Sequence, residues 1–479
     1  MAARRVCSHT LKPPGRHALA ALMYTEDTIA AIATPQGPGG IGVVRLSGPQ
    51  CVAIAAAVFR GRRPAHEWTS HRMYRGMILD VAGAALDEAL AVHMRAPHSY
   101  TGEDVLELHC HGSPALVRQV LARVLCCGAR AAQPGEFTKR AFLNGRLDLA
   151  QAEAVIELVQ ARTGDAAQLA VQQLGGRLST HVDNLRTQLI HLKALLEAQI
   201  DFSDEDVEVK QVELLGCINK SISIVTKSIN TYSHGKLLRE GVRVAIIGKP
   251  NAGKSSLLNA LLGEERAIVT PIAGTTRDAI EEAVDFDGIP VVLTDTAGLR
   301  QMEHADPIER MGMERTGGTI AASQLLLPVL DASAPLDAAD HTVLETARGL
   351  PAVLVLNKID LGPPVFEPIA VAAGMPVVQV SAQQRSGLPE LRRAVIAVAT
   401  SGLTVEHGTP VLTNARHHAA LTQAVDSLQL ARQSISAGQT ADLVAVDVQD
   451  AIDHIGSITG IVTSEDVLDR IFSEFCIGK

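Results

Sequence analysis

A glycine-rich stretch in the middle of the chain, residues 248–255 (GKPNAGKS), has the residue types and spacing of a phosphate-binding loop. It follows the apolar run 242–247 and precedes the apolar-rich segment 256–262, so we expect a buried strand, the loop and then a helix. Backbone N–H groups of such a loop surround phosphate oxygens, and the helix N-terminus favours their charge. Lys254 would contact the β- and γ-phosphates, and Ser255 would bind Mg²⁺. The alternative is a chance glycine turn before a helix.

Two further motifs have the residue types that close around a γ-phosphate. Residues 274–278 (GTTRD) lie in an expected loop, where Thr276 would be the second protein ligand of Mg²⁺. The apolar run 291–294 predicts a strand that ends in residues 295–298 (DTAG). The carboxylate of Asp295 would hold the Mg²⁺ shell through water, and the N–H of Gly298 would face the γ-phosphate.

The last two motifs identify the base. The run 353–356 leads into residues 357–360 (NKID), and the run 377–380 ends in Ser381-Ala382. A carboxylate at Asp360 accepts two hydrogen bonds from the N1–H and N2–H₂ edge of guanine, whereas adenine presents an acceptor at N1. The joint occurrence of these motifs, in this order, therefore predicts a GTPase.

Hydrolysis also requires a group that orients water. Ras-like proteins use a glutamine shortly after this Asp-x-x-Gly turn, but here Leu299 follows Gly298 and cannot take that role. No arginine finger is evident in the sequence. Another carboxylate must therefore polarise the water, and another cation must offset the developing charge.

An α/β block, residues 239–401, carries all of these motifs and lies between two helical stretches, 143–238 and 402–479. Pro328 interrupts the run 325–330, where a central strand is expected. Because proline cannot donate a hydrogen bond to a neighbouring strand, we expect an edge position or a bulge there. The sequence leaves open whether the two helical stretches pack together.

Apolar stripes predict the helices. Leucines and a valine between 182 and 196 are spaced by three and four residues, which is typical of an amphipathic helix. Further helices are predicted at 212–232, 414–434, 442–455 and after a capping box at Thr463 and Asp466. Gly175-Gly176 is expected to interrupt an earlier helix. The acidic residues 201–206 lack the glycine of a calcium loop and predict a solvated turn.

Residues 23–142 have the pattern of an α+β domain. Strands are expected at 29–33, 41–46, 89–94 and 105–110, and a helix at 114–125. Arg45 and Glu107 each lie inside an apolar strand run. Such a charge either lies on a solvated face or lines a ligand pocket, and the periodicity alone favours the solvated face.

Composition limits the class of protein. A chain of 479 residues suggests about three domains. The net charge of −9 argues against a sequence-blind coat on nucleic acid, but not against one local basic site. Seven cysteines without a C-x-x-C pair indicate a reducing compartment, and no apolar run has the length of a membrane span. We therefore expect a cytoplasmic protein that does not enter a membrane.

The first residues resemble a leader. Residues 1–25 carry four basic residues and no acid, as an organelle transit peptide does. The composition equally fits an unstructured leader, or a start site assigned too early with Met23 as the natural start, and these simpler interpretations are favoured. Residues 1–22 lie outside the pattern described next.

With these residues in hand, the chain resembles the tRNA modification GTPase family MnmE, also called TrmE, over essentially all of 23–479. The marks are residues 99–104 (SYTGED), 134–138 (PGEFT), 251–256 (NAGKSS), 274–278 (GTTRD) and 475–479 (FCIGK).

The resemblance implies a multidomain α/β and α+β fold. It implies an N-terminal folate-binding and dimerisation domain over 23–142, a discontinuous helical domain over 143–238 and 402–479, and an inserted Ras-like G domain over 239–401. It also implies a site for 5-formyl- or 5,10-methylene-tetrahydrofolate. Its residues are Arg45, Glu107, Arg146 and Lys479. The family more often has lysine where Arg146 stands, which keeps the charge but changes the geometry.

The resemblance further implies a K⁺ ion beside the phosphates, in place of an arginine finger, with ligands at Asn251, Thr270, Ile272 and Thr275. Glu309 matches the catalytic glutamate that polarises water. The motifs and the resemblance together give the following GTP-binding residues: Asn251, Ala252, Gly253, Lys254, Ser255, Ser256, Thr270, Pro271, Ile272, Ala273, Gly274, Thr275, Thr276, Asp295, Thr296, Ala297, Gly298, Asn357, Lys358, Asp360, Ser381 and Ala382.

The family's activity is an expectation for this chain. It implies that a homodimer hydrolyses GTP and, in a heterotetramer with an FAD-dependent partner of the MnmG (GidA) type, adds a carboxymethylaminomethyl or aminomethyl group at C5 of the wobble uridine of certain tRNAs. Cys476 is either a group in this chemistry or a buried apolar residue of the last helix. The second hypothesis for the chain is a regulatory GTPase that binds RNA. Lys139-Arg140 is the basic pair nearest to the folate-domain motifs, and a solvated helix face is the favoured interpretation of it.

Overall fold

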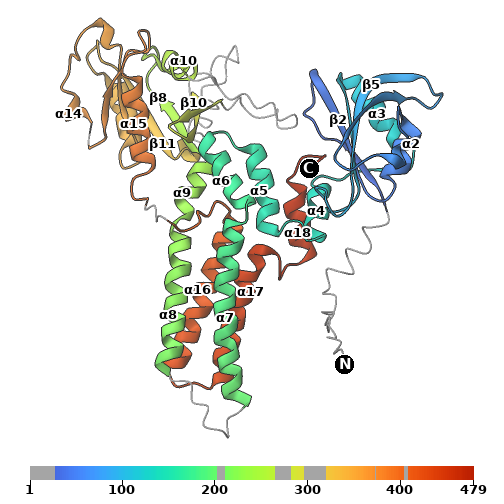
Figure 1. Cartoon of the computed structure of the whole chain (residues 1–479). Helices are drawn as coiled ribbons and strands as arrows, with labels where there is room; N and C mark the ends of the chain where they lie inside the picture. The colour runs from blue at the N-terminus through green and yellow to red at the C-terminus, as the bar shows by residue number, and fades with distance from the viewer. Residues whose placement is uncertain (1–26, 202–210, 265–281, 296–319, 373, 404–407) are drawn as a thin grey trace, which may run out of the picture. The chain divides into compact units, whose positions relative to one another are not determined.

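The computed structural model describes residues 27–201, 211–264, 282–295, 320–372, 374–403 and 408–479. The chain divides into two compact units (Figure 1). The first contains the chain up to Ile156 together with Thr459–Lys479, and the second contains Glu157–Ile458. The leader at 1–22 and the acidic turn that follows Asp201 lie outside the described residues.

A seven-stranded sheet, in the order β3-β4-β5-β6-β2-β1-β7, is the centre of the first unit. Its neighbouring strands are antiparallel except β1 and β7. The strands are β1 (Ile29–Ile32), β2 (Gly39–Ser47), β3 (Phe59–Gly61), β4 (Met73–Leu79), β5 (Ala85–Met94), β6 (Val105–Gly112) and β7 (Arg130–Ala131). The four predicted strands are confirmed as β1, β2, β5 and β6.

Alternation along β2 separates the core from the site. Val44 and Leu46 are buried, and they pack with residues of β6 and with helices α2 (Cys51–Val58) and α3 (Pro114–Leu125). Because successive side chains point to opposite faces of a sheet, Arg45 lies on the other face. The register places Arg45 directly opposite Glu107 of β6. The other helices that contribute to this unit are α4 (Glu136–Leu143), α5 (Leu149–Gln160) and α18 (Glu465–Ser473).

The predicted cap of α18 is wrong. The helix begins at Glu465 with Ser464 as its N-cap, and that side chain makes no capping hydrogen bond. The N-cap therefore falls one residue after the expected Thr463. Glu465 and Asp466 in the first turn instead favour the helix through its dipole. The buried residues Leu468 and Phe472 form its apolar stripe.

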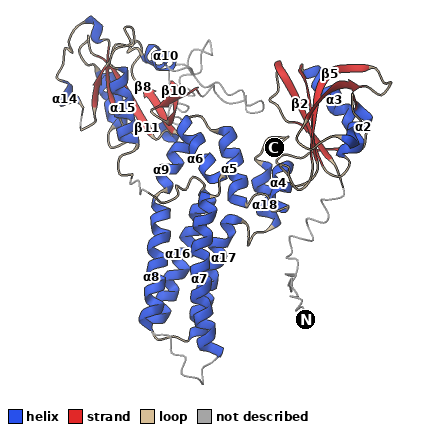
Figure 2. Cartoon of the chain, viewed as in Figure 1, coloured by secondary structure: helices blue, strands red, loops and turns tan. Residues whose placement is uncertain are grey.

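The helical part of the second unit combines segments from both sides of the α/β block. Its helices are α6 (Gly164–Leu174), α7 (Arg177–Asp201), α8 (Gln211–Asn230), α9 (Tyr232–Glu240), α16 (Ala415–Ser436) and α17 (Ala441–Thr459). Figure 2 shows α7, α8, α16 and α17 lying together. The Gln211 amide donates to the carbonyl oxygen of Ile435 at 2.6 Å. The two helical stretches therefore do pack together, as a discontinuous helical domain.

The predicted glycine interruption is confirmed, because α6 ends at Leu174 with Gly175 as its C-cap. The predicted helix 212–232 instead breaks at Thr231 into α8 and α9. The Thr231 hydroxyl donates to Ser228 O at 2.7 Å and accepts from Leu412 N at 3.0 Å. A tertiary contact from the returning chain thus fixes the break, and no local sequence signal marks it.

The α/β part of this unit contains a six-stranded sheet in the order β13-β12-β11-β8-β10-β9. All pairs are parallel except β9 and β10. The strands are β8 (Val242–Ile247), β9 (Glu282–Phe286), β10 (Ile289–Asp295), β11 (Leu325–Asp331), β12 (Leu354–Asn357) and β13 (Val377–Gln379). The helices are α10 (Lys254–Glu264), α13 (Ala338–Ala347), α14 (Pro368–Val371) and α15 (Leu388–Ala399).

The prediction for Pro328 is wrong. β11 lies inside the sheet, between β12 and β8, and its register contains no shift over the described residues. Leu326 N donates to Pro351 O on the β12 side, so the residue two positions later would face the same neighbour. The ladder with β12 is an isolated bridge at Leu326 and is continuous only from Val329. Pro328 therefore lies in a gap of one ladder and keeps its pairing with Ile247 of β8.

A helix that spans a membrane must be both long and apolar. Among the helices that the structure describes, none is both long and apolar enough to cross a bilayer.

Candidate functional sites

The glycine loop joins β8 to α10, as the sequence predicts. Asn251 and Gly253 have φ values of 62° and 92°, so the backbone turns through the left-handed region. A Cβ atom at Gly253 would lie 2.2 Å from the side-chain nitrogen of Asn357. Only glycine fits there, because both the backbone conformation and the close amide exclude a side chain.

Lys254 is 6% exposed and turned toward its own loop. Its ammonium group donates to the carbonyl oxygens of Gly248 and Lys249, both at 2.8 Å. The loop thereby holds a cation beside its own N–H groups, which is the arrangement that binds phosphate. The Ser255 and Ser256 side chains are exposed at the start of α10. A hydroxyl in this position is a hard oxygen ligand and fits Mg²⁺.

Asn357 connects the phosphate loop with the last motif. This side chain is 2% exposed. Its nitrogen donates to Ala252 O at 3.0 Å, and its oxygen accepts from Ala382 N at 3.1 Å. The Ser381 hydroxyl donates to the Asp360 carboxylate at 2.5 Å. Residues from three separate motifs are therefore brought together, with the Asp360 carboxylate held in one orientation.

Several predicted residues cannot be placed. Asp295 is the last residue of β10. Its backbone pairs with Ile246, the penultimate residue of β8. Its side chain is outside the described residues. The others outside them are Thr270, Pro271, Ile272, Ala273, Gly274, Thr275, Thr276, Thr296, Ala297, Gly298 and Glu309.

The first unit contains a second polar group of residues around Arg45. The Arg45 guanidinium donates to Glu107 at 2.8 Å and to the carbonyl oxygen of Gly478 at 3.3 Å. It also lies 5.8 Å and 5.9 Å from the ring centres of Tyr100 and Phe137. The two charged side chains are only 20% and 15% exposed, so the solvated-face interpretation of Arg45 and Glu107 is wrong.

Glu107 is held on both oxygens. His109 lies 3.0 Å from the oxygen that Arg45 does not use. The hydrogen bond with His109 lowers the pKa of Glu107 below its usual 4.5, and the charge of Arg45 lowers it further, against the effect of burial. A ligand that hydrogen-bonds to Glu107 must therefore share an oxygen with one of these partners. The residues predicted for this site do not include His109, Tyr100 and Phe137. His109 lies two residues after Glu107, so strand alternation could have placed both on one face, whereas only tertiary packing brings Tyr100 and Phe137 to Arg45.

The C-terminal segment lies against the same group of residues. A Cβ atom at Gly478, whose φ is 96°, would lie 2.4 Å from the carbonyl oxygen of Ile32 in β1. Burial lowers the pKa of the Lys479 amine, and the neighbouring Arg45 lowers it further. Cys476 and Glu107 act in the opposite direction. Cys476 itself is exposed, so it is not a buried apolar residue of the last helix.

Arg146 is tied to the loop that carries Tyr100. Its side chain donates to Ser99 O at 3.0 Å. The structure therefore brings Arg45, Glu107 and Lys479 together, and Arg146 is connected to them through this loop.

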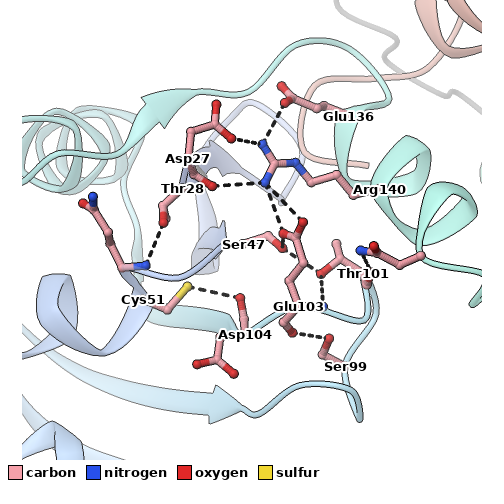
Figure 3. A network of polar contacts seen from close by, with 12 residues as sticks. Asp27, Thr28, Ser47, Cys51, Ser99, Thr101, Glu103, Asp104, Glu136 and Arg140 are labelled. Carbon is pink, nitrogen blue, oxygen red and sulfur yellow. Dashed lines mark hydrogen bonds and ion pairs between the residues drawn. The ribbon is translucent and has the colours of Figure 1, made fainter. Parts of the chain in front are cut away.

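A buried ion cluster supports this region, and the prediction of a solvated face for Lys139-Arg140 is wrong for Arg140 (Figure 3). Arg140 is 1% exposed and contacts the carboxylates of Asp27 at 2.6 Å, Glu103 at 3.1 Å and Glu136 at 3.1 Å. Lys139 pairs with Asp469. One sequence signal was available, because Arg140 follows the buried Phe137 by three residues and so shares its helix face.

The cluster anchors the elements beneath Arg45. Ser47, two residues after Arg45, donates to Glu103 at 2.7 Å. The hydroxyl groups of Tyr100 and Thr138 lie 2.8 Å apart. Tyr100 precedes Glu103 by three residues, and Thr138 precedes Arg140 by two. Among the described residues, no group of three histidine, cysteine or acidic side chains has a metal-binding arrangement.

Comparisons with known proteins match both units. A model of the "MnmE helical domain" matches residues 149–476, and a model of the "GTP-binding protein TrmE N-terminus" matches residues 28–146. The tRNA modification GTPase MnmE of Natranaerobius thermophilus is 43% identical over 459 residues, covering 95% of this chain and 100% of the relative. The proteins of that name from Geobacter sulfurreducens and Moorella thermoacetica are both 46% identical, with the same coverage.

Replacing Arg140 by methionine should destabilise the first unit by about 3–5 kcal/mol, because buried carboxylates lose their cation. Trp68 is the only tryptophan of the chain and is buried in this unit, so its fluorescence in a denaturant titration reports the unfolding. Arg75→Met is the control. Its pair with Glu88 is exposed, so the expected loss is below about 1 kcal/mol. Equal effects of the two substitutions would contradict the role of the cluster.

The penalty for Arg140→Met should also depend on pH. Burial raises the pKa of Asp27 and Glu136, but hydrogen bonds from Arg130 and Arg140 outweigh it, so both lie below their usual 3.8 and 4.5. A depressed carboxyl pKa stabilises the fold above the unfolded value, and this stability is lost as pH falls through the folded value. The difference between wild type and variant should therefore be full above pH 4.5 and shrink below it. A constant difference from pH 7 to pH 3 would exclude this account.

Proposed function

The chain belongs to the MnmE family of tRNA modification GTPases, and we propose that it hydrolyses GTP to GDP and phosphate to drive the modification of tRNA in the cytoplasm. The observation that carries this proposal is the contact of Asn357 with Ala252 and Ala382, which joins the phosphate loop to the base-recognition residues. Asp360, oriented by Ser381, selects guanine.

The phosphate end uses the loop and two cations. Lys254 leaves the loop carbonyls for the β- and γ-phosphates, and Ser255 and Thr276 hold Mg²⁺. Asn251, with Thr270, Ile272 and Thr275, holds K⁺; Asn251 fits because its exposed side chain lies on the left-handed turn of the loop. A bound K⁺ supplies the positive charge that an arginine finger provides elsewhere. Glu309 orients and polarises the attacking water.

The second site binds a folate one-carbon donor. Arg45, Glu107, Arg146 and Lys479 supply charges for its polar groups, and the rings of Tyr100 and Phe137 adjoin Arg45. Cys476, exposed near Lys479, acts on the tRNA base or the one-carbon unit. A homodimer pairs with an FAD-dependent partner of the MnmG type. Together they add the carboxymethylaminomethyl or aminomethyl group at C5 of the wobble uridine.

The test of this proposal is the nucleoside content of tRNA from cells that lack the chain. We expect the C5-modified wobble uridine to disappear from digested tRNA analysed by mass spectrometry, and to return when the gene is restored. A restored Lys254→Ala variant should not bring it back, because it cannot hold the phosphates. Undiminished modified uridine in the deletion strain would favour the regulatory, RNA-binding GTPase instead.

GTP turnover should depend on the monovalent cation. Replacing K⁺ by Na⁺ at constant ionic strength should lower the rate roughly a hundredfold, because the smaller ion does not fill the same ligand shell beside the γ-phosphate. In K⁺, Glu309→Ala should lower turnover by about 10²–10⁴-fold, with GDP affinity retained. Equal rates in the two salts would remove K⁺ from the mechanism, and an active Glu309→Ala enzyme would remove the glutamate.

A further inference from the structure

The connection between β11 and α13 carries three aspartates that hold two lysines of the nucleotide site. Asp331, the last residue of β11, accepts from the Lys358 ammonium at 2.7 Å. Asp337 and Asp340, at the start of α13, accept from the Lys249 ammonium at 3.0 Å and 2.6 Å. Lys249 belongs to the phosphate loop and Lys358 to the base-recognition motif. A single acidic connection therefore contacts both ends of the nucleotide site.

The ion pairs of Asp340 and Asp331 are not ordinary surface pairs, whereas Asp337 is 56% exposed. The side chains of Asp340, Asp331 and Lys249 are 2%, 14% and 17% exposed. Burial alone would raise the pKa of Asp331, but the hydrogen bonds from Lys358 and Ser333 outweigh it and leave the pKa below its usual value. Hydrogen bonds to Asp340 and Asp337 raise the pKa of Lys249. Asp331 and Lys249 therefore keep their charges in the folded protein at neutral pH.

Hydrogen bonds that do not involve the lysines also hold the three aspartates in place. Asp337 caps α13, accepting from Ala339 N at 2.9 Å and Asp340 N at 3.1 Å, while Asp340 accepts from Asp337 N at 3.1 Å. This reciprocal capping box holds both carboxylates at a rigid helix end. Asp331 is likewise fixed by Ser333, whose N–H and hydroxyl donate to its second oxygen. Preorganised carboxylates position a flexible lysine at little further entropic cost.

Hydrogen bonds link this connection and Lys249 to two predicted nucleotide-binding residues, Lys254 and Asn357. The carbonyl oxygen of Lys249 is one of the two that hold the Lys254 ammonium. Ala332, next to Asp331, donates its N–H to the carbonyl oxygen of Asn357 at 2.9 Å. Displacing the connection would therefore move both Lys254 and Asn357.

We propose that Asp331, Asp337 and Asp340 form an acidic brace whose grip on Lys249 and Lys358 positions the phosphate loop against the base-recognition motif and thereby sets the affinity for guanine nucleotides. These are positioning residues, since they act through the two lysines. The inference rests on the proposed GTPase function.

The sign of the effect separates positioning from a simple electric field. GDP is an anion, so a field acting through space would weaken binding when Lys249 is neutralised and strengthen it when Asp340 is neutralised. A positioning role weakens binding in both cases. We expect Lys249→Met and Asp340→Asn each to raise the Kd for a fluorescent methylanthraniloyl derivative of GDP roughly tenfold. The double variant should bind no more weakly than Lys249→Met alone, because the Lys249–Asp340 contact that Asp340→Asn removes is already lost in Lys249→Met.

Two controls make the experiment specific. Glu345→Gln removes a carboxylate from the same helix, where its pair with Arg348 is exposed, and should leave the Kd within about twofold. Lys249→Arg should restore most of the affinity, which loss of folding would not predict. An unfolding curve of each variant, recorded without nucleotide, gives its folded fraction at the assay temperature.

The outcomes distinguish this inference from the function on which it rests. A wild-type chain that binds no GDP derivative would refute the proposed function itself. Wild-type binding with unchanged Kd in Lys249→Met and Asp340→Asn would refute the brace alone. Tighter binding by Asp340→Asn would show that Lys249 and Asp340 affect binding through their charge and not by positioning the site.

Discussion

One buried amide, that of Asn357, sets the geometry of the nucleotide site. It donates to the phosphate loop at Ala252 and accepts from the last motif at Ala382. An amide can serve both partners at once because it has a donor and an acceptor on adjacent atoms. Since the side chain is 2% exposed, leaving either partner unsatisfied is costly, and the loops around the nucleotide are held in one arrangement. Gly253 has no side chain because this amide occupies the space.

The second site follows a similar logic with charges in place of an amide. Arg140 is surrounded by carboxylates from the segment before β1, from the loop before β6 and from its own helix. A buried cation of this kind contributes little net stability but makes one arrangement of its neighbours much better than others. Those neighbours include the residues that adjoin Tyr100 and Phe137, on which the Arg45 guanidinium rests. The ion cluster therefore supports the residues that are predicted to contact the ligand.

How much the sequence predicts depends on how far apart the contacting residues lie in it. The phosphate loop and its flanking strand and helix are local, so eight residues and their context suffice. Arg45 and Glu107 meet through strand register, 62 residues apart, and the resemblance rather than the periodicity pointed to them. The solvated interpretation of Arg140 is wrong although a charge on a short helix usually faces solvent. Glu136 lies four residues earlier on the same helix, but no local pattern connects Asp27 and Glu103 to Arg140. Pro328 was misplaced for a different reason: a strand can omit one donor if the gap falls in only one of its two ladders.

The hydrogen bond between Arg45 and Gly478 joins residues 433 positions apart. It can form only after the whole helical domain and the G domain have been synthesised. Until then Arg45 has Glu107 but lacks this carbonyl, Lys479 and Cys476, so the sheet of the first unit can fold before its site is complete. Domains generally fold in order as the chain emerges, and a sheet with its own core of Val44, Leu46 and their partners is able to do so. The chain therefore separates the core of this sheet, which the first part of the chain supplies, from the site, which needs a residue 433 positions further along.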